Sequence, residues 1–237
     1  MTARYAVYFL PDARSQLARF GAGWLGWDVH RAKPVTLRPV AGVGQEAHRT
    51  LVAAPSVYGF HATLKAPMRL APGVALEQFL DAVSELAASR PKTADLRLVP
   101  RKLGRFLALT QTRSDPAVAK LADLCVKELD RFRAPLTPSD RQRRRPEALT
   151  DNQRVLLERW GYPFVFEEYR FHMTLTGPLD DVIGEKAKVA LETAMMPVLE
   201  QPAAIDALSV VVQSAPGTPF RLLAGFPLRG CGCPVPR

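Results

Sequence analysis

The chain has 237 residues, of which 47% are hydrophobic, so it can bury a core as one two-lobed domain or two small ones. No apolar run approaches the ~18 residues that a membrane-spanning helix needs, and the first residues lack the pattern of an export signal. We therefore expect a cytoplasmic protein with no membrane partner. The formal net charge of +9 favours phosphorylated or nucleic-acid partners, although a basic protein with neither remains an alternative.

The chain contains three cysteines, and an odd number argues against a disulfide framework. Cys125 belongs to an apolar helical face and is expected to be packed. Cys231 and Cys233 lie in a tail rich in glycine and proline, which we expect to be flexible from 229 to 237. Neither has further metal ligands nearby in the sequence, so we predict no metal site and no cofactor.

The chain should begin with a strand over 4–10, followed by a helix that starts near Pro11. From 27 to 56 the pattern is poor, with several prolines and glycines, which predicts a long connection or a short helix within loops. Long connections are often functional, but the sequence leaves open whether this one closes as a lid. His30 and His48 lie here, and we expect both at the surface because neither belongs to a repeated pattern.

Two eleven-residue stretches, 58–68 and 169–179, share the pattern Y-x-F-H-x-T-L-x-x-P-(M/L). Six positions are identical, and the two stretches use two of the four histidines. Each is followed by the same predicted order of elements. A helix over 74–89 and a hairpin over 96–109 follow the first stretch, and a helix over 180–199 and a hairpin over 205–226 follow the second. The sequence therefore predicts a duplicated lobe.

Each stretch contains a short run of β-favouring residues that ends near glycine or proline, which is typical of a strand. Residues two apart in a strand share a face, so His61 and Thr63 point one way while Phe60, Ala62 and Leu64 point into a core. The second stretch places His172 and Thr174 on one face in the same manner. Two such strands facing across a cleft offer a pair of imidazoles and a pair of hydroxyls.

This quartet suits phosphoryl chemistry without a metal. With an ordinary pKa near 6.5, one imidazole can take a proton from water while the other gives a proton to a leaving oxygen. The threonine hydroxyls can hold the non-bridging phosphate oxygens. The alternative is that both histidines are ordinary core residues of paired strands, which a single H-x-T would favour.

The two lobes are separated by a connector with an amphipathic helix over 115–132 and a second helix expected from Thr150, whose capping-box spacing includes Gln153. Six arginines lie between them: Arg131, Arg133, Arg141, Arg143, Arg144 and Arg145. They form either a solvated basic loop or a phosphate clamp at the rim of the cleft. No aromatic residue interrupts 141–145, so base stacking on that segment is not supported.

Three further residues belong to the candidate substrate site. Lys65 has the strand parity to face the cleft and contact phosphate. Tyr58 and Tyr169 stand three residues before each histidine, so in a regular strand they face away and pack. A bulge at Gly59 would redirect Tyr58 towards the cleft.

The twin H-x-T strands resemble the 2H phosphoesterase superfamily, which includes RNA cyclic phosphodiesterases and 2′-5′ RNA ligases. Four stretches, 5–9, 58–67, 136–145 and 159–179, also resemble one branch of it, a family encoded beside carbon–phosphorus lyase genes. The resemblance implies an α+β fold with antiparallel sheets lining a central cleft and helices outside. We expect one bilobal domain, with lobes at about 58–110 and 165–228 and a connector at 115–160.

The resemblance implies a metal-independent cyclic phosphodiesterase in which His61 and His172 are acid and base. A small phosphorylated sugar, such as a ribose cyclic phosphate formed in phosphonate degradation, is the expected substrate. An RNA end carrying a 2′,3′-cyclic phosphate is the alternative partner, with cyclic phosphodiesterase or ligase activity. A non-catalytic protein that binds nucleotides or RNA ends is an alternative of another class. The sequence leaves open the oligomeric state and which histidine is the acid.

Overall fold

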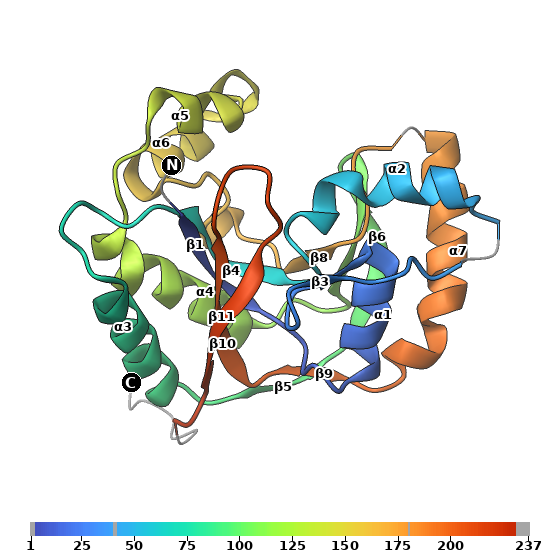
Figure 1. Ribbon diagram of the computed structural model, residues 1–237, viewed down its shortest axis with the longest axis horizontal. Coiled ribbons are helices and arrows are strands. Elements are labelled where there is room, and N and C mark those ends of the chain that lie inside the picture. Colours follow the sequence, from blue (N-terminus) through green and yellow to red (C-terminus); the bar gives the residue numbers. More distant parts are fainter. Residues whose placement is uncertain (1–2, 40–41, 180, 231–237) are drawn as a thin grey trace.

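The two H-x-T strands are neighbours at the centre of one antiparallel sheet in the computed structural model, which describes residues 3–39, 42–179 and 181–230. The sheet runs in the order β11 (Arg221–Pro227), β10 (Ala207–Gln213), β1 (Arg4–Phe9), β4 (Ala62–Met68), β8 (His172–Thr174), β7 (Phe106–Gln111) and β6 (Leu98–Leu103). The predicted α+β class is therefore confirmed (Figure 1). The motif strands share one sheet, whereas the sequence predicted that they face each other across a cleft.

Two short strand pairs lie outside this sheet. They are β2 (Trp27–Asp28) with β3 (Lys33–Pro34), and β5 (Thr93–Leu96) with β9 (Ala203–Ile205). The helices are α1 (Gln16–Leu25), α2 (Gln45–Ser56), α3 (Leu76–Ala88), α4 (Pro116–Leu129), α5 (Pro138–Arg143), α6 (Asp151–Trp160) and α7 (Asp181–Leu199). Short 3₁₀ turns occur at Asp130–Phe132, Pro146–Ala148 and Phe166–Glu168.

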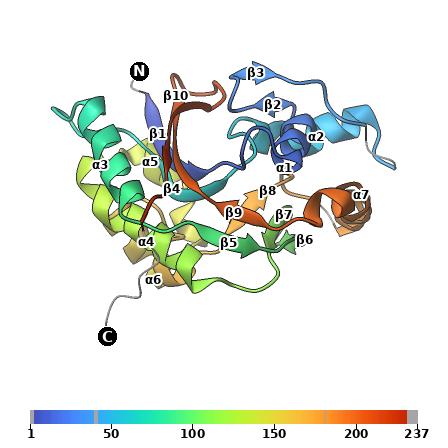
Figure 2. The ribbon, with the colours of Figure 1, turned by 90° about the horizontal axis from the view of Figure 1, so that it is seen from below.

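The same order of elements follows each motif strand, but the halves exchange their hairpins. The hairpin β6–β7, which follows the first motif, pairs with β8 of the second motif and is covered by α7. The hairpin β10–β11, which follows the second motif, pairs with β1 and is covered by α3. The chain crosses between the halves through β5 and β9, which pair with each other (Figure 2). Each half therefore carries the hairpin that follows the motif of the other half.

Local sequence explains where several helices begin and end. Thr150 caps α6 by accepting a hydrogen bond from the Gln153 amide, and the Gln153 side chain accepts one from the Thr150 amide, which is the predicted capping box. Asp115 caps α4 and is followed by proline at the first helical position. The helix α1 ends at Gly26, which adopts the left-handed conformation that glycine tolerates best.

The alternation predicted for the motif strands is confirmed. The apolar side chains of both stretches are at most 5% exposed and belong to the main core: Phe60, Ala62, Leu64, Phe171, Met173 and Leu175. Cys125 is also buried in this core, as predicted. Burial raises the pKa of its thiol to about 12, so the thiol stays protonated at neutral pH.

Three sequence expectations concern the segments around this core. The segment 27–56 contains a helix, α2, and its end at Ala54 and Pro55 reaches the cavity described below. The expectation of a surface position was wrong for His48, which is 2% exposed and packs on Trp24. In the tail, the amides of Arg229 and Gly230 donate to backbone carbonyls, and Cys231 and Cys233 lie outside the described residues.

Candidate active site

One backbone pairing brings the two motifs together. Ala62 of β4 lies opposite Met173 of β8 in antiparallel register. This register places His61 opposite Thr174 and Thr63 opposite His172, so each imidazole faces a hydroxyl of the other strand. All four side chains line one cavity of about 490 Å³. The structure therefore assembles the predicted quartet, related by a local two-fold arrangement.

The two histidines are oriented by equivalent backbone contacts. The Nδ1 atom of His61 lies 2.9 Å from the Gly59 carbonyl oxygen, and Nδ1 of His172 lies 2.8 Å from the Arg170 carbonyl oxygen. A carbonyl can only accept, so each Nδ1 carries the proton and donates it. In the neutral imidazole this leaves a lone pair on Nε2 of both rings, and that of His61 faces the Thr63 hydroxyl. Each ring can therefore act as a base through Nε2, or as an acid once Nε2 is protonated.

Burial shifts both histidines towards the neutral form. Desolvation, with a smaller contribution from the nearby His172, lowers the pKa of His61 from 6.5 to about 4, although the Gly59 contact opposes the shift. Desolvation also lowers the pKa of His172, opposed by the Arg170 contact. Near neutral pH the free protein thus holds two imidazoles that accept protons, and a bound phosphate anion would favour protonation of either.

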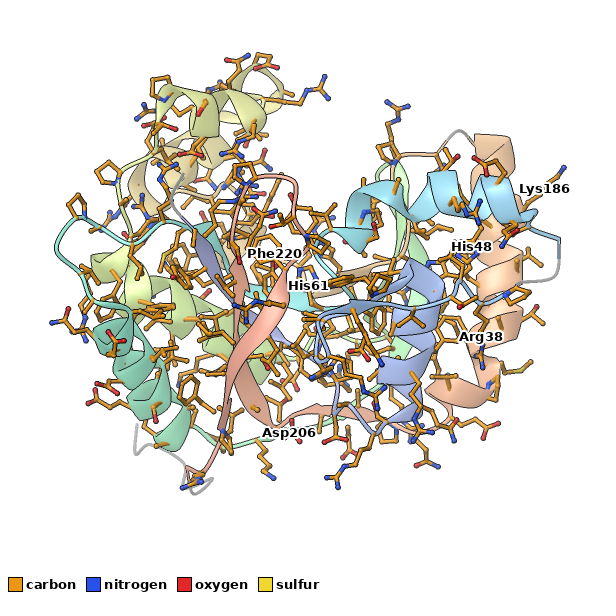
Figure 3. The ribbon with its side chains drawn as sticks, viewed as in Figure 1. Arg38, His48, His61, Lys186, Asp206 and Phe220 are labelled. Carbon is orange, nitrogen blue, oxygen red and sulfur yellow. The ribbon has the colours of Figure 1, made fainter. Side chains whose placement is uncertain are left out.

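Tyr8 supports His61 from the neighbouring strand. Its ring stacks on the imidazole with centroids 3.7 Å apart and an angle of 20° between the planes. Tyr8 is fully buried on β1, where it pairs with Thr63 of β4. Phe220 packs beside Tyr8, with ring centroids 6.0 Å apart, and Figure 3 places His61 and Phe220 at the centre of the molecule. No sequence pattern pointed to Tyr8, because its role depends on which strand lies beside β4.

The remaining motif side chains are held differently in the two strands. The Thr63 hydroxyl lies 3.2 Å from His61 Nε2 and donates to that nitrogen in the neutral ring. Lys65 lines the cavity, as its parity predicted, but its side chain is 4% exposed and its ammonium lies 3.2 Å from both the Asp130 carboxylate and the Val126 carbonyl. Its counterpart Thr176 is buried and accepts a hydrogen bond from the Leu107 amide. Lys65 is therefore committed to an internal ion pair.

The arginine segment divides into cavity and surface positions. Arg143 and Arg144 line the cavity, and the Arg144 guanidinium lies over the Tyr162 ring, 4.7 Å from its centroid. Arg141 does not line it and forms a two-point hydrogen bond with Glu158 of α6, at 2.7 Å for each contact. Arg145 is exposed, has a positive φ of 50°, and does not line the cavity either. Helix α5 thus turns only part of the cluster inward.

The two tyrosines of the motifs differ in position. Tyr58 lines the cavity and stacks on Phe220, with centroids 5.5 Å apart. Gly59 has a φ of 72°, so the backbone turns at the position where a redirecting bulge was considered. Tyr169 packs against the core outside this cavity, and its buried hydroxyl has no hydrogen-bond partner in the part of the chain that the structure describes. It lines a second cavity of about 430 Å³, which adjoins the first through Thr63, Phe106 and His172.

The cavity carries an excess of positive charge. Its lining contains six cations, Arg4, Lys65, Arg69, Arg133, Arg143 and Arg144. Asp130 pairs with Lys65 and Arg133, and Asp140 pairs with Arg69 and Arg143. Among the described residues, Arg4 and Arg144 have no carboxylate partner. Arg4 and Arg69 were not predicted to line the cavity, because neither the strand pattern at 4–10 nor the motif at 58–68 indicates a role for them.

The structure also bears on metals and membranes. In the part of the chain that the structure describes, no group of three or more His, Cys, Asp or Glu side chains comes together to hold a metal ion. No described helix is both long enough and apolar enough to cross a membrane.

These features define an α+β protein with a positively charged two-histidine cavity. Residues 63–221 match the family described as "Protein of unknown function (DUF1045)", and the chain belongs to that family. It is 38% identical over 233 residues to a protein named ribose 1,5-bisphosphate phosphokinase PhnN from Janthinobacterium sp. (strain Marseille), covering 97% of this chain and 51% of that protein. A protein of the same name from Laribacter hongkongensis (strain HLHK9) is 37% identical, with 92% and 50% covered. The chain thus spans about half the length of these curated relatives.

Solved structures with a similar arrangement were also found. A structure titled "Crystal structure of phosphoesterase" has a TM-score of 0.44 and 14% identity, covering 96% of this chain and 99% of the other. Escherichia coli LigT complexed with 3′-AMP gives a TM-score of 0.44 and 15% identity, with the same coverage. The protein TT0787 of Thermus thermophilus gives 0.42 and 16%, with 97% and 99% covered.

Proposed function

We propose that this protein is a metal-independent phosphoesterase of the two-histidine type, which opens a cyclic phosphodiester by adding water. The observation that carries the proposal is the register of Ala62 with Met173, which sets two histidines and two threonines around one cavity. Hydrolysis of such a diester needs a base, an acid and donors for the non-bridging oxygens. The quartet contains all of these groups.

The proposal assigns the base to His61 and the acid to His172. His61 has its pKa lowered to about 4 and is neutral in the free protein, so its Nε2 is ready to accept a proton from water. The oxygen of that water bonds to phosphorus, and the bond from phosphorus to the leaving oxygen breaks. His172, protonated in the complex beside the anionic phosphate, gives its Nε2 proton to that oxygen. Thr63 and Thr174 donate to the non-bridging oxygens.

The proposed substrate is a ribose carrying a 1,2-cyclic phosphate and a 5-phosphate, namely 5-phosphoribosyl 1,2-cyclic phosphate. The support is the resemblance to the phosphonate-associated branch together with the name of the two relatives, which refers to ribose 1,5-bisphosphate. Opening of this ring gives ribose 1,5-bisphosphate only if the 2-oxygen leaves and the 1-phosphate stays. We therefore propose that the 2-oxygen is the one protonated by His172.

Product analysis tests this proposal. The purified protein would be incubated with 5-phosphoribosyl 1,2-cyclic phosphate in EDTA, and phosphorus NMR would follow the product. The expected result is ribose 1,5-bisphosphate, recognised by coupling of the new phosphate to the anomeric proton. A product with its phosphate on the 2-oxygen would contradict the assigned direction, and absence of turnover would contradict the substrate.

RNA ends remain the second candidate substrate, favoured by the positive charge of the cavity and by the wider superfamily that the motifs resemble. The two candidates differ in how many phosphates they engage. Binding of an RNA end should weaken steeply with salt, since several counterions are released. Binding of a small sugar phosphate should depend on salt less steeply. The non-catalytic alternative predicts tight binding of cyclic phosphates with no turnover at all.

A further inference from the structure

We propose that Arg4, Tyr8 and Arg144 form a second anion site, which binds a phosphate monoester of the substrate while the histidines act on its cyclic phosphate. The inference rests on the proposed function for its role in catalysis, but the binding site itself is argued from geometry. It would make the protein specific for cyclic phosphates that carry a further phosphate group.

The first observation is that the positive charges of the two arginines are not balanced by a carboxylate among the described residues. The other four cations of the cavity lining share the carboxylates of Asp130 and Asp140. Arg4 and Arg144 have no carboxylate partner among the described residues. Burial lowers the pKa of Arg4, and Arg144 lies close enough that its charge lowers that pKa further. Two unbalanced guanidinium groups beside one cavity match a phosphate monoester, which carries nearly two negative charges at neutral pH.

The second observation is that neighbouring residues hold both arginine side chains in place. Arg4 donates from Nε to the Gln213 side-chain oxygen at 2.8 Å, and its guanidinium lies 5.7 Å from the centre of the Phe220 ring. Arg144 lies over the Tyr162 ring. The ring contacts use the apolar faces of the guanidinium groups and leave N–H donors for a ligand. A preformed pair of this kind loses little freedom on binding.

The third observation is the hydroxyl of Tyr8. This oxygen is buried, has no hydrogen-bond partner among the described residues, and belongs to a residue that lines the cavity. An unpartnered buried hydroxyl is costly unless a ligand or water completes it. Burial raises the pKa of Tyr8 well above 10, so the hydroxyl keeps its proton and can donate to an anion. Arg4 and Arg144 both lie near enough to this hydroxyl for their charges to lower its pKa and so partly oppose the effect of burial.

The spacing along β1 sets the arginine end of this site apart from the histidines. Tyr8 stacks on His61, and Arg4 lies four residues earlier on the same face of the strand, roughly 13 Å away along the backbone at ~3.3 Å per residue. Arg143 and Arg144, at the end of α5, lie near enough to Arg4 for their charges to lower its pKa. In the proposed complex the cyclic phosphate of the sugar lies at the histidines and its second phosphate at the arginine end of the cavity.

Binding of ribose 5-phosphate tests the site without requiring turnover. Calorimetry would compare the natural protein, Arg144→Gln and Arg4→Gln with the control Arg141→Gln, which removes an arginine of the same segment that is paired with Glu158 outside the cavity. We expect Kd to rise about 10- to 100-fold in the first two variants, since each loses a charged hydrogen bond, and to stay within about twofold in the control. Equal affinity in Arg144→Gln and Arg141→Gln, or no binding by the natural protein, would overturn the proposal.

A kinetic comparison separates this proposal from the proposed function. The ratio of kcat/KM for 5-phosphoribosyl 1,2-cyclic phosphate to that for ribose 1,2-cyclic phosphate would be measured in the same proteins. We expect the ratio to fall about 10-fold or more in Arg144→Gln, mainly through KM, and to be unchanged in Arg141→Gln. An unchanged ratio in Arg144→Gln would overturn the second site. Absence of turnover on both substrates would refute the proposed function, and the calorimetric comparison alone would then test the second site.

Discussion

Ala62 and Met173 lie opposite each other in neighbouring antiparallel strands, and this pairing sets the geometry of the cavity. Because the central residue of one H-x-T faces that of the other, each histidine comes to lie across from the threonine of the other strand. The hairpins β6–β7 and β10–β11 extend the sheet on either side of this centre. A two-residue pairing at the middle of the sheet thus converts two distant sequence motifs into one site.

Both histidines should be needed equally for turnover. His61→Ala and His172→Ala should each lower kcat about 10²- to 10⁴-fold, and the double variant should lose little more, because acid and base act in one step. Steady-state kinetics would measure this. His30→Gln is the matched control, since His30 lies outside the cavity and contacts the Pro11 carbonyl. Full activity in either single alanine variant would refute the paired role.

Loss of either threonine hydroxyl, on Thr63 or Thr174, should lower kcat strongly and the stability of the fold only slightly. Thr63→Val keeps the shape of the side chain and removes the hydroxyl that lies 3.2 Å from His61 Nε2. We expect kcat to fall about 10²- to 10³-fold, as for the loss of one donor to the transition state, with the melting temperature changed by only a few degrees. Thr174→Val should behave alike. An unchanged kcat in both would show that the hydroxyls do not contact phosphate.

The activity should be greatest in mildly acidic solution. The base must be neutral and the acid protonated, and burial lowers the pKa of both histidines below 6.5. As the pH rises, kcat/KM should start to fall before pH 6.5 is reached, because His172 loses its proton. As the pH drops, kcat/KM should fall near pH 4, because His61 becomes protonated. A plateau that extends above about pH 8 would contradict these assignments.

The same shift makes stability depend on pH. Folded His61 binds its proton with a pKa of about 4, whereas the unfolded chain binds it near 6.5, so between these values the unfolded state holds more protons. The free energy of unfolding should fall as the pH drops from 6.5 to 4, by up to about 3 kcal/mol from this residue. Denaturant unfolding of His61→Gln should show a smaller loss over that range. An identical pH dependence in both proteins would contradict the burial of His61.

The pair of Lys65 and Asp130 should matter for stability. Asp130→Asn leaves the Lys65 side chain, which is 4% exposed, without its countercharge. We expect a loss of about 3 kcal/mol, and a smaller loss for Lys65→Met, which removes the buried charge itself. Urea unfolding would compare the two. A larger loss for Lys65→Met would mean that the pair is strongly favourable in its own right.

Local patterns predicted the parts of this fold that depend on neighbouring residues. The alternation of Phe60 to Leu64, the capping box at Thr150 and both hairpins follow from spacing along the chain, and the structure contains each of them. The histidine and threonine faces were also predictable, since parity within a strand is a local property. For Tyr58 the strand parity favoured a packed ring facing away from the cleft, and the structure instead follows the alternative, with a positive φ at Gly59 and Tyr58 in the cavity lining.

What escaped prediction depends on contacts between distant segments. Tyr8 and Arg4 belong to the cavity only because β1 pairs with β4, which no pattern within β1 indicates. Which arginines of 141–145 line the cavity depends on the orientation of the six-residue helix α5. It also depends on Glu158, which forms an ion pair with Arg141 outside the cavity. His48 was expected at the surface, and its burial depends on Trp24, which lies 24 residues earlier in the chain.

The most direct test of the central claim is turnover of 5-phosphoribosyl 1,2-cyclic phosphate and of a nucleoside 2′,3′-cyclic phosphate, side by side in EDTA, by the natural protein and its His61→Ala and His172→Ala variants. The account predicts that the sugar substrate is hydrolysed without metal and that both variants lose the activity. Turnover that requires added metal, or that survives in either variant, would contradict the two-histidine mechanism.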